Sequence, residues 1–225
     1  MDDIKFLHKY LDLYKSSTSD LLQIGRGITF VEGFVLTSFM KEIGVDLIIE
    51  SGMAFGMSTE IFAKCMRDIP IISIDNDRYK VFNETTKRLS KYKNIQTIFG
   101  DSFKEIPSLL NKKQEFKKIA LFIDGPKGRS AIKLGKDLLN DKRIKLISIH
   151  DIHIKGGMFS VFENNFGKSF SSHNLENEWV EIRDNINNYY LDLNLERHPS
   201  NSSTFKEYME EVPLGPGIAI SLTNE

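Results

Sequence analysis

Acidic residues and glycines recur where runs of apolar residues end in this sequence. The first such place is Glu50-Ser51-Gly52-Met53-Ala54-Phe55-Gly56-Met57-Ser58, in which two glycines stand four positions apart. Glycine lets the backbone turn tightly, and it lets a ligand approach where a side chain would collide. The pattern predicts a ligand-binding turn, and an ordinary strand–helix turn is the alternative interpretation.

Polar residues follow four later apolar runs in the same way. Asp75-Asn76 follows the second run, and a carboxylate there can accept hydrogen bonds from both hydroxyls of a ribose. Gly100-Asp101-Ser102 follows the third, where Asp101 either faces an adenine amino group or caps the next helix. Asp124 follows the fourth run and His150-Asp151 the fifth. One such acid is commonly a cap or turn residue, but a series on one sheet edge predicts a binding site.

Short apolar runs alternate with amphipathic stretches across the middle of the chain. This pattern predicts strands over 45–49, 71–74, 95–99, 119–123 and 144–149, with helices over 58–67, 78–91, 102–111 and 129–140. Such alternation is typical of parallel strands with right-handed crossovers and helices on both faces. Open α/β sheets bind ligands at the carboxyl ends of their strands, which is where the acidic residues stand.

The flanking segments are predicted from their periodicity and turn residues. We expect a helical lead-in over 1–44 and a main domain over 45–225. In the lead-in, helices over 3–15 and 29–43 are separated by a polar break at 16–20. Beyond 152 we expect a loop with one short helix over 153–177, a helix over 178–187, and a strand over 189–195 that forms a closing hairpin with a final strand over 218–222. Within that loop, Gly156-Gly157-Met158-Phe159 is a candidate lid, and the later Trp179 is expected to be a core residue.

Composition narrows the functional classes. The net charge is -1, from 30 basic and 31 acidic residues, which gives no electrostatic reason to expect a nucleic-acid partner. There is no apolar run long enough to span a bilayer and no apolar signal core after Met1, so we expect a cytoplasmic protein without a membrane partner. The single Cys65 excludes an internal disulfide and a cysteine metal cluster. The apolar N-terminal helix pair could form a homodimer face.

Taken together, Glu50-x-Gly52-x-x-x-Gly56, Asp75, Gly100-Asp101 and Asp124 resemble the successive motifs of class I S-adenosylmethionine (SAM)-dependent methyltransferases. The resemblance covers residues 45–152. It implies a Rossmann-like, doubly wound α/β fold with a mostly parallel seven-stranded sheet and an antiparallel last strand. It also implies SAM as the cofactor, bound by Glu50, Gly52, Met53, Gly56, Ser58, Asp75, Asn76, Gly100, Asp101, Ser102 and Asp124. The Gly-x-Gly-x-x-Gly of dinucleotide dehydrogenases is absent.

Within that class, the sequence is most similar to the catechol-type metal-dependent O-methyltransferases and to cephalosporin-hydroxylase-like proteins. This likeness implies that Asp124 and Asp151, with His150 beside them, hold Mg²⁺, and that Lys127 is the catalytic base. Magnesium would bind a substrate hydroxyl and favour its ionised form. His150 stands where the family usually has an acid. It could instead be the general base, or a ligand for a softer metal such as Mn²⁺ or Fe²⁺.

The function that we expect is SAM-dependent O-methylation of a small hydroxylated molecule or a sugar. Two alternatives remain on the same fold: a module that binds SAM without transferring its methyl group, and a metal-dependent hydrolase or hydroxylase-like enzyme. The fourth strand is followed by Asp124-Gly125-Pro126-Lys127 and not by Asn-Pro-Pro-Tyr, which argues against adenine or glutamine N-methylation. We expect the lead-in and the loop over 153–177 to bind the acceptor.

Overall fold

Five apolar segments form parallel strands at the centre of the molecule. The structure is a computed structural model, and it describes residues 4–22, 27–152, 157–173, 176–193 and 217–223. Alternate residues of each strand face opposite sides of the sheet, so that Ile48 and Leu47 belong to different hydrophobic clusters. The parallel strands are β1 (Leu47–Ser51), β2 (Ile71–Asp75), β3 (Ile95–Phe99), β4 (Ile119–Ile123) and β5 (Ile144–His150).

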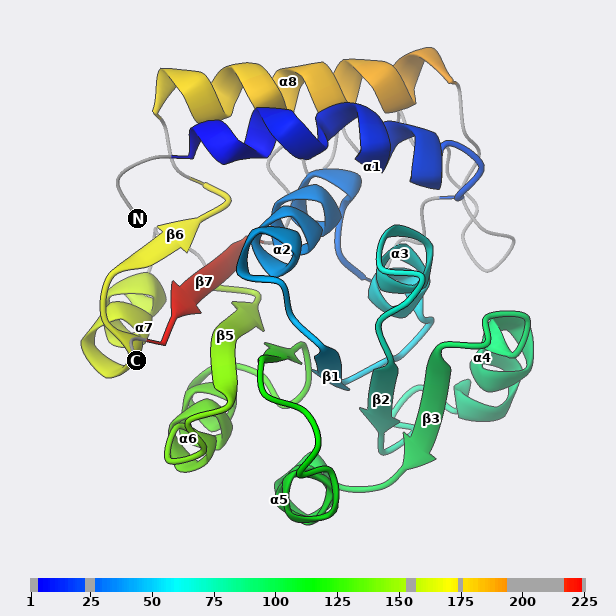
Figure 1. Cartoon of the computed structure of the whole chain (residues 1–225), viewed down its shortest axis with the longest axis vertical. Coiled ribbons are helices and arrows are strands. Elements are labelled where there is room, and N and C mark those ends of the chain that lie inside the picture. Colours follow the sequence, from blue (N-terminus) through cyan, green and yellow to red (C-terminus); the bar gives the residue numbers. More distant parts are fainter. Residues whose placement is uncertain (1–3, 23–26, 153–156, 174–175, 194–216, 224–225) are drawn as a thin grey trace.

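Two short strands complete a sheet of seven strands within the described residues. They are β6 (Ser169–Ser171) and β7 (Ile218–Leu222), and the strand order is β3-β2-β1-β4-β5-β7-β6. β7 lies between β5 and β6 and is antiparallel to both. Along the sequence, β2 and β3 are added on one side of β1, and the chain then crosses over so that β4 lies on the other side of β1 (Figure 1). The predicted mostly parallel sheet with an antiparallel last strand is therefore confirmed.

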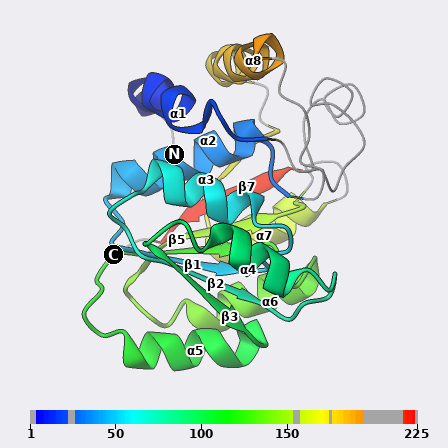
Figure 2. The ribbon, with the colours of Figure 1, turned by 90° about the vertical axis from the view of Figure 1, so that its right-hand side faces the viewer.

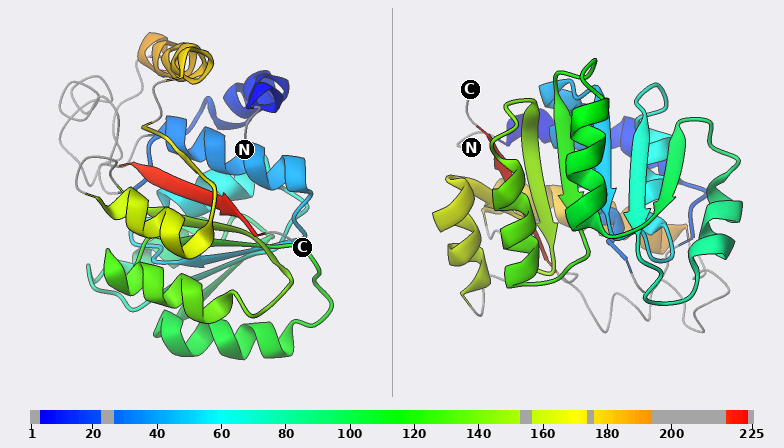
Figure 3. Two further views of the ribbon diagram at one scale, coloured as in Figure 1. Left: turned by 90° about the vertical axis from the view of Figure 1, so that its left-hand side faces the viewer. Right: turned by 90° about the horizontal axis from the view of Figure 1, so that it is seen from below.

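Helices cover both faces of the sheet (Figure 2). On one face lie α2 (Phe30–Ile43) and α3 (Met57–Cys65), beneath an outer layer made by the 3-10 helix η1 (Lys5–Tyr10), α1 (Leu11–Thr18) and α8 (Asn177–Asp192). The opposite face carries α5 (Ser102–Lys112), α6 (Arg129–Leu138) and α7 (Met158–Phe166), and the right-hand view of Figure 3 shows α5 and α6 in front of the strands. Helix α4 (Phe82–Leu89) lies beside the edge strand β3.

The bounds of α2 follow from its two caps. The Thr29 side chain accepts a hydrogen bond from the Glu32 backbone N–H, and the Glu32 side chain accepts one from the Thr29 backbone, which makes a capping box. At the other end Gly44 adopts the left-handed conformation, with φ at 68°. The helix predicted over 29–43 is confirmed, and its first turn lies beside the candidate site described below.

The polar break predicted at 16–20 is wrong for residues 16–18, because α1 continues through Thr18. The Thr18 hydroxyl donates to the backbone oxygen of Tyr14, 2.7 Å away, and also hydrogen-bonds to the Tyr190 hydroxyl. Both side chains are buried. A polar side chain that finds two buried partners can stay in a helix, so the run of polar residues does not end α1.

The strand predicted over 189–195 is also wrong, because α8 continues to Asp192. Its buried residues Trp179, Ile182, Ile186 and Tyr190 recur at helical spacing and face α2 and η1. The expected partner of the last strand is replaced by β6, which lies within the segment expected to be mostly loop. Residues 194–195 and 213–216, where the rest of that strand and the hairpin turn were predicted, lie outside the described residues.

Other expectations concern single residues and the lid segment. Cys65 is a buried free thiol. Trp179 is a core residue, as predicted: its ring contacts Phe170 edge-on and its indole N–H donates to the Ser172 backbone oxygen at 2.9 Å. Of the candidate lid, Met158 and Phe159 form the first turn of α7, and Gly156 lies outside the described residues. No helix among the described residues is long and apolar enough to cross a membrane.

Candidate functional site

A cleft of about 770 Å³ opens at the carboxyl ends of the parallel strands. This is the switch point where the strand order reverses between β1 and β4, the usual ligand position in open α/β sheets. Most of the acidic and glycine residues predicted from strand ends line it. The predicted lining residues are Gly52, Asp75, Asn76, Gly100, Asp101, Ser102, Asp124, Lys127, His150 and Asp151.

The turn after β1 passes very close to the loop after β4. Gly52 has φ at +91°, and a Cβ on it would lie 2.5 Å from the backbone nitrogen of Gly125. The backbone N–H groups of Asp124 and Gly125 both donate to the Ser51 oxygen, at 2.7 and 2.9 Å. A glycine at position 52 is therefore required for these two loops to form one wall of the cleft.

Asp75, at the end of β2, is oriented by two backbone N–H groups. One carboxylate oxygen accepts from Ala54 at 2.8 Å, and the other accepts from Asp77 at 2.6 Å. Ala54 has φ at +44°, a conformation uncommon outside glycine, and this turns its N–H toward Asp75. Because a carboxylate has about four acceptor positions, both oxygens can still accept a hydrogen bond from a ligand. The side chain is thus held ready for a ligand with two neighbouring donors.

Asp101 is the N-cap residue of α5. Its side chain accepts a hydrogen bond from the Phe103 backbone N–H at 3.0 Å, so the capping interpretation is confirmed for this residue. Its side chain is nevertheless exposed in the cleft beside Phe103. Ser102 is buried and accepts a hydrogen bond at 2.6 Å from the Ser51 hydroxyl, which connects the start of α5 to β1. These contacts fix the floor of the cleft.

Four residues predicted to bind the cofactor do not line the cleft: Glu50, Met53, Gly56 and Ser58. Glu50 is buried and accepts hydrogen bonds from Ser58, Thr59 and Ser73. Burial raises the pKa of Glu50 to about 7, against the lowering effect of the three hydroxyls. Met53 is buried, and Gly56 begins α3 with φ at 75°. These four residues therefore belong to the turn after β1 and its flanking elements, and not to the wall of the cleft.

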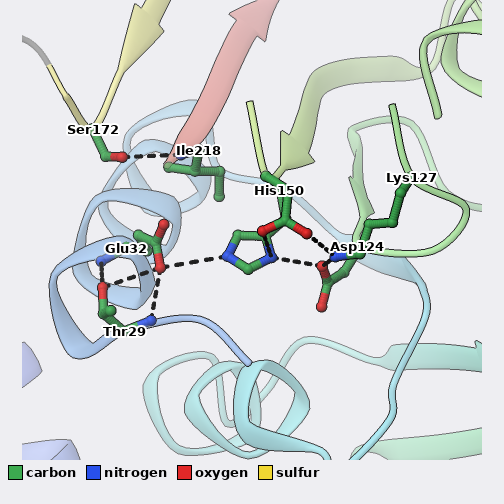
Figure 4. A network of polar contacts seen from close by, with 8 residues as sticks. Thr29, Glu32, Asp124, Lys127, His150, Ser172 and Ile218 are labelled. Carbon is green, nitrogen blue, oxygen red and sulfur yellow. Dashed lines mark hydrogen bonds and ion pairs between the residues drawn. The ribbon is translucent and has the colours of Figure 1, made fainter. Parts of the chain in front are cut away.

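His150, at the end of β5, lies between two carboxylates (Figure 4). Its Nδ1 is 2.6 Å from Asp124 Oδ1 and its Nε2 is 3.5 Å from Glu32 Oε2. Burial disfavours the charged imidazolium, but the carboxylates of Asp124 and Glu32 outweigh it and raise the pKa of His150 to about 10. For Asp124, burial is outweighed by His150 and Lys127, which hold the pKa of its carboxyl well below the ordinary value. At neutral pH this is a charged pair.

Lys127 joins the same cluster from the loop after β4. Its ammonium group pairs with Asp124 Oδ1 and, at 2.6 Å, with Asp151 Oδ2. Burial would lower the pKa of Lys127, but Asp124 and Asp151 raise it. Lys127 is therefore held as a cation rather than as the neutral amine that a general base requires. Asp151 has φ at +59°, so an uncommon backbone conformation presents its carboxylate to Lys127.

The three residues predicted to bind metal are brought together. Atoms of Asp124, His150 and Asp151 that could bind a cation all lie within 4.8 Å of one another. However, the Lys127 ammonium already pairs with both carboxylates, and the ring nitrogen of His150 nearest Asp124 is directed at Asp124 Oδ1. A divalent cation needs those oxygens and an imidazole lone pair for itself. As arranged, the residues do not fit Mg²⁺, Mn²⁺ or Fe²⁺.

Several residues of the site were not predicted from the sequence. Glu32 Oε2 reaches His150 while accepting from the Thr29 backbone N–H at 2.7 Å. The spacing of Thr29 and Glu32 signals a helix cap, but nothing local shows that the cap faces β5. Arg78, Tyr79 and Phe103 also line the cleft. Tyr79 and Phe103 are among the large apolar residues that stay exposed, which only the folded structure reveals.

Comparisons with known proteins identify the fold. No family model matches the sequence, and no curated protein matches it. Among solved structures, a putative caffeoyl-CoA O-methyltransferase from Staphylococcus aureus is 16% identical with a TM-score of 0.52, over 100% of this chain and 93% of that one. An O-methyltransferase from Bacillus cereus in complex with SAH is 14% identical with a TM-score of 0.52, over 100% and 93%. An SAH-bound methyltransferase from Podospora anserina is 13% identical with a TM-score of 0.50, over 99% and 89%.

These similarities extend over nearly the whole of each chain, and they concern the fold. The chain has the Rossmann-like fold of the class I SAM-dependent methyltransferases, as the motif resemblance implied.

Proposed function

We propose that this chain is a SAM-dependent methyltransferase that transfers a methyl group to an oxygen of a small hydroxylated molecule or a sugar. One observation carries the proposal. A single cleft at the switch point combines the glycine turn of β1 and the oriented carboxylate of Asp75 with a buried charged cluster at the ends of β4 and β5. The first two features suit a nucleoside, and the third suits chemistry on a hydroxyl group.

The nucleoside part of SAM lies in the half of the cleft formed by β1, β2 and β3. Asp75 accepts hydrogen bonds from the two ribose hydroxyls with the acceptor positions that Ala54 and Asp77 leave open. Ile74, Tyr79 and Phe103 supply apolar surface for the adenine ring. A volume of about 770 Å³ is within the usual range for sites that enclose a ligand of this size.

The charge of the cluster suits the sulfonium group of SAM. Glu32, Asp124 and Asp151 contribute three carboxylates, whereas Lys127 and His150 contribute two cations, so one formal negative charge remains. A sulfonium next to this cluster is attracted to it, and the attraction is strong because water is largely excluded from Asp124 and His150. After methyl transfer the sulfur is neutral, so the attraction is lost and release of the product becomes easier.

The proposed reaction is a direct displacement at the methyl carbon. A lone pair of the acceptor oxygen forms the new carbon–oxygen bond while the carbon–sulfur bond breaks and its electrons remain on sulfur. The hydroxyl proton passes to Asp151, whose side chain is 36% exposed compared with 13% for Asp124. Lys127 remains an ammonium group and stabilises the negative charge that develops on the acceptor oxygen. The protein contributes mainly alignment and charge placement.

Isothermal titration with SAM and SAH tests the cofactor part, and formation of SAH from SAM in the presence of a panel of hydroxylated acceptors tests the transfer. We expect Asp124→Asn to abolish transfer, because it leaves two cations without their shared carboxylate. Asp137→Asn, which changes a carboxylate exposed on α6, is the matched control. Binding of SAM without transfer to any acceptor would favour the non-transferring module, and absence of binding would overturn the proposal.

A further inference from the structure

The two carboxylates at the ends of β4 and β5 share a single cationic partner. Lys127 Nζ lies 2.6 Å from Asp151 Oδ2 and also pairs with Asp124 Oδ1, so one ammonium bridges side chains that come from different loops. A bridging position between two carboxylates is the place that a divalent cation occupies in oxygen-ligand sites. Here a side chain of the protein already occupies it.

The third potential metal ligand, His150, also has carboxylate neighbours. His150 is buried with its ring between Asp124 and Glu32, and each ring nitrogen faces a carboxylate oxygen, at 2.6 Å and 3.5 Å (Figure 4). An imidazole that binds a metal must direct a lone pair at it, whereas Nδ1 of His150 is already hydrogen-bonded to Asp124. Nδ1 is also the ring nitrogen nearest Asp151, at 3.6 Å, and it is directed at Asp124 Oδ1 and not at a position between the two carboxylates.

The backbone supports the same arrangement. Asp151 adopts φ at +59°, which is uncommon for a residue other than glycine, and this conformation brings its carboxylate to Lys127. Aspartate adopts this left-handed conformation more readily than most residues other than glycine. In this conformation the Asp151 carboxylate pairs with Lys127, whose side chain comes from the loop after β4.

From these observations we infer that the ammonium group of Lys127 replaces the divalent cation at this site, so that the cluster neutralises an acceptor oxygen without bound metal. The role in the reaction rests on the proposed function, but occupation of the cation position does not. Lys127 supplies one positive charge where a metal would supply two, and His150 supplies the second from the other side of Asp124. A fixed side-chain cation also needs no metal supply.

The test is Mn²⁺ binding to the full chain, with neither SAM nor acceptor present. Binding is measured from the electron paramagnetic resonance signal of the free ion. Mn²⁺ prefers the oxygen ligands that Mg²⁺ prefers and can be detected directly. We expect no binding by the unchanged protein at millimolar Mn²⁺. We expect Lys127→Met to bind Mn²⁺ with a dissociation constant at least ~10-fold below the highest Mn²⁺ concentration at which the unchanged protein shows no binding, because two carboxylates then lack a cation at close range. Lys133→Met, which removes a lysine paired with Asp137 on α6, should behave as the unchanged protein.

The outcomes separate this inference from the proposed function. If the unchanged protein binds Mn²⁺ as tightly as Lys127→Met does, or if neither binds it, the inference is overturned. Circular dichroism checks the fold of the variant, and Lys127→Gln replaces it if Lys127→Met does not fold. A rise of the unfolding temperature with Mn²⁺ in the variant alone is a second supporting readout. Failure of SAM to bind would overturn the proposed function and leave the metal result standing.

Discussion

Asp124 holds two cations with one oxygen atom. His150 Nδ1 and Lys127 Nζ both contact its Oδ1, although the side chain is mostly buried. A buried charge without a partner costs several kcal/mol, so each member of this cluster depends on the others. Single substitutions here change the charge state of the neighbours as well as the residue itself. The stability of the protein should therefore report the state of the site.

The stability of the folded protein should depend on pH through His150. The pKa of His150 is about 10 in the folded protein and 6.5 without these contacts, so folding binds a proton between pH 6.5 and pH 10. The contribution to stability is complete below pH 6.5 and is lost as pH rises toward 10, with a slope approaching about 1.4 kcal/mol per pH unit. Urea unfolding across this range should show the slope in the unchanged protein and a smaller one in His150→Gln. Equal slopes would contradict the charged pair.

Substitution of Asp75 tests the ribose contact and therefore depends on the proposed function. In Asp75→Asn an amide N–H₂ replaces an oxygen that accepts from a backbone N–H and, in our proposal, from a ribose hydroxyl. We expect SAM to bind about 10- to 100-fold more weakly, as measured by isothermal titration. Glu84→Gln, an exposed change on α4 outside the cleft, should bind SAM normally. Unchanged affinity in Asp75→Asn would show that the ribose is bound elsewhere.

Single residues could be predicted where their position in an apolar run fixes their place. Asp75, Asp124 and His150 each end or follow such a run, so they had to lie at the carboxyl edge of the sheet. Glu32 could not be found in this way, because its contact with His150 joins residues far apart in the sequence. The pairing of Lys127 with two carboxylates likewise depends on the loop conformation after β4, which no local pattern specifies.

Among the elements, the turns after β1 and β4 are the most constrained. They meet at Gly52, where the backbone nitrogen of Gly125 occupies the space that a Cβ would need. Ser51 strengthens the same contact, since its backbone oxygen accepts from both Asp124 and Gly125. The position of Asp124 therefore depends on the turn after β1. A change in one loop should be detectable in the other.

The prediction at this scale is that Gly52→Ala destabilises the protein by about 2–4 kcal/mol, because positive φ and a backbone collision act together. Gly44→Ala is the matched control. It also has positive φ, at +68°, but its nearest neighbour is the end of the Lys118 side chain at 3.9 Å. We expect only about 1–2 kcal/mol there, from backbone strain alone. Thermal unfolding of both variants checks this, and equal losses would mean that the close approach is relieved by loop movement.

The success of sequence-based prediction also differed between elements. The strands β1 to β5 and the helices between them were found because short apolar runs alternate with amphipathic stretches in this part of the chain. The β6 strand has only three residues, Ser169–Ser171, which is too short for any pattern. The last turns of α8 contain Tyr189 and Tyr190, a residue type common in strands. Tyr190 is nevertheless buried where a helix continues the spacing of Trp179, Ile182 and Ile186. Tertiary packing outweighed local preference there.

At the scale of the whole molecule, the outer helices are joined to the sheet by one continuous hydrophobic cluster. Tyr190 of α8 stacks on Phe30 of α2, with ring centroids 3.7 Å apart, and Phe30 belongs to the same cluster as Ile48 and Phe122 in the sheet. The N-terminal helices therefore share their core with the strands. Such continuity favours cooperative unfolding of the whole molecule.

We therefore predict a single unfolding transition. Trp179 is the only tryptophan in the sequence and is buried in α8, so its fluorescence reports on the outer layer, whereas far-ultraviolet circular dichroism reports on all helices and strands. The two denaturation curves should coincide. Tyr190→Leu should shift both by the same amount, about 2–4 kcal/mol, because it removes a buried ring and the hydrogen bond with Thr18. Separate curves would show that the outer layer unfolds independently.

The position of β7 has a consequence for synthesis on the ribosome. Among the described residues β7 is the last strand in the sequence, yet it lies between β5 and β6, which are translated before it. Until Ile218–Leu222 is translated, the backbone groups of β5 and β6 that face each other across this gap have no partner strand. Unpaired strand edges of this kind recruit other chains. The nascent chain must therefore remain protected from its neighbours until its final strand is inserted.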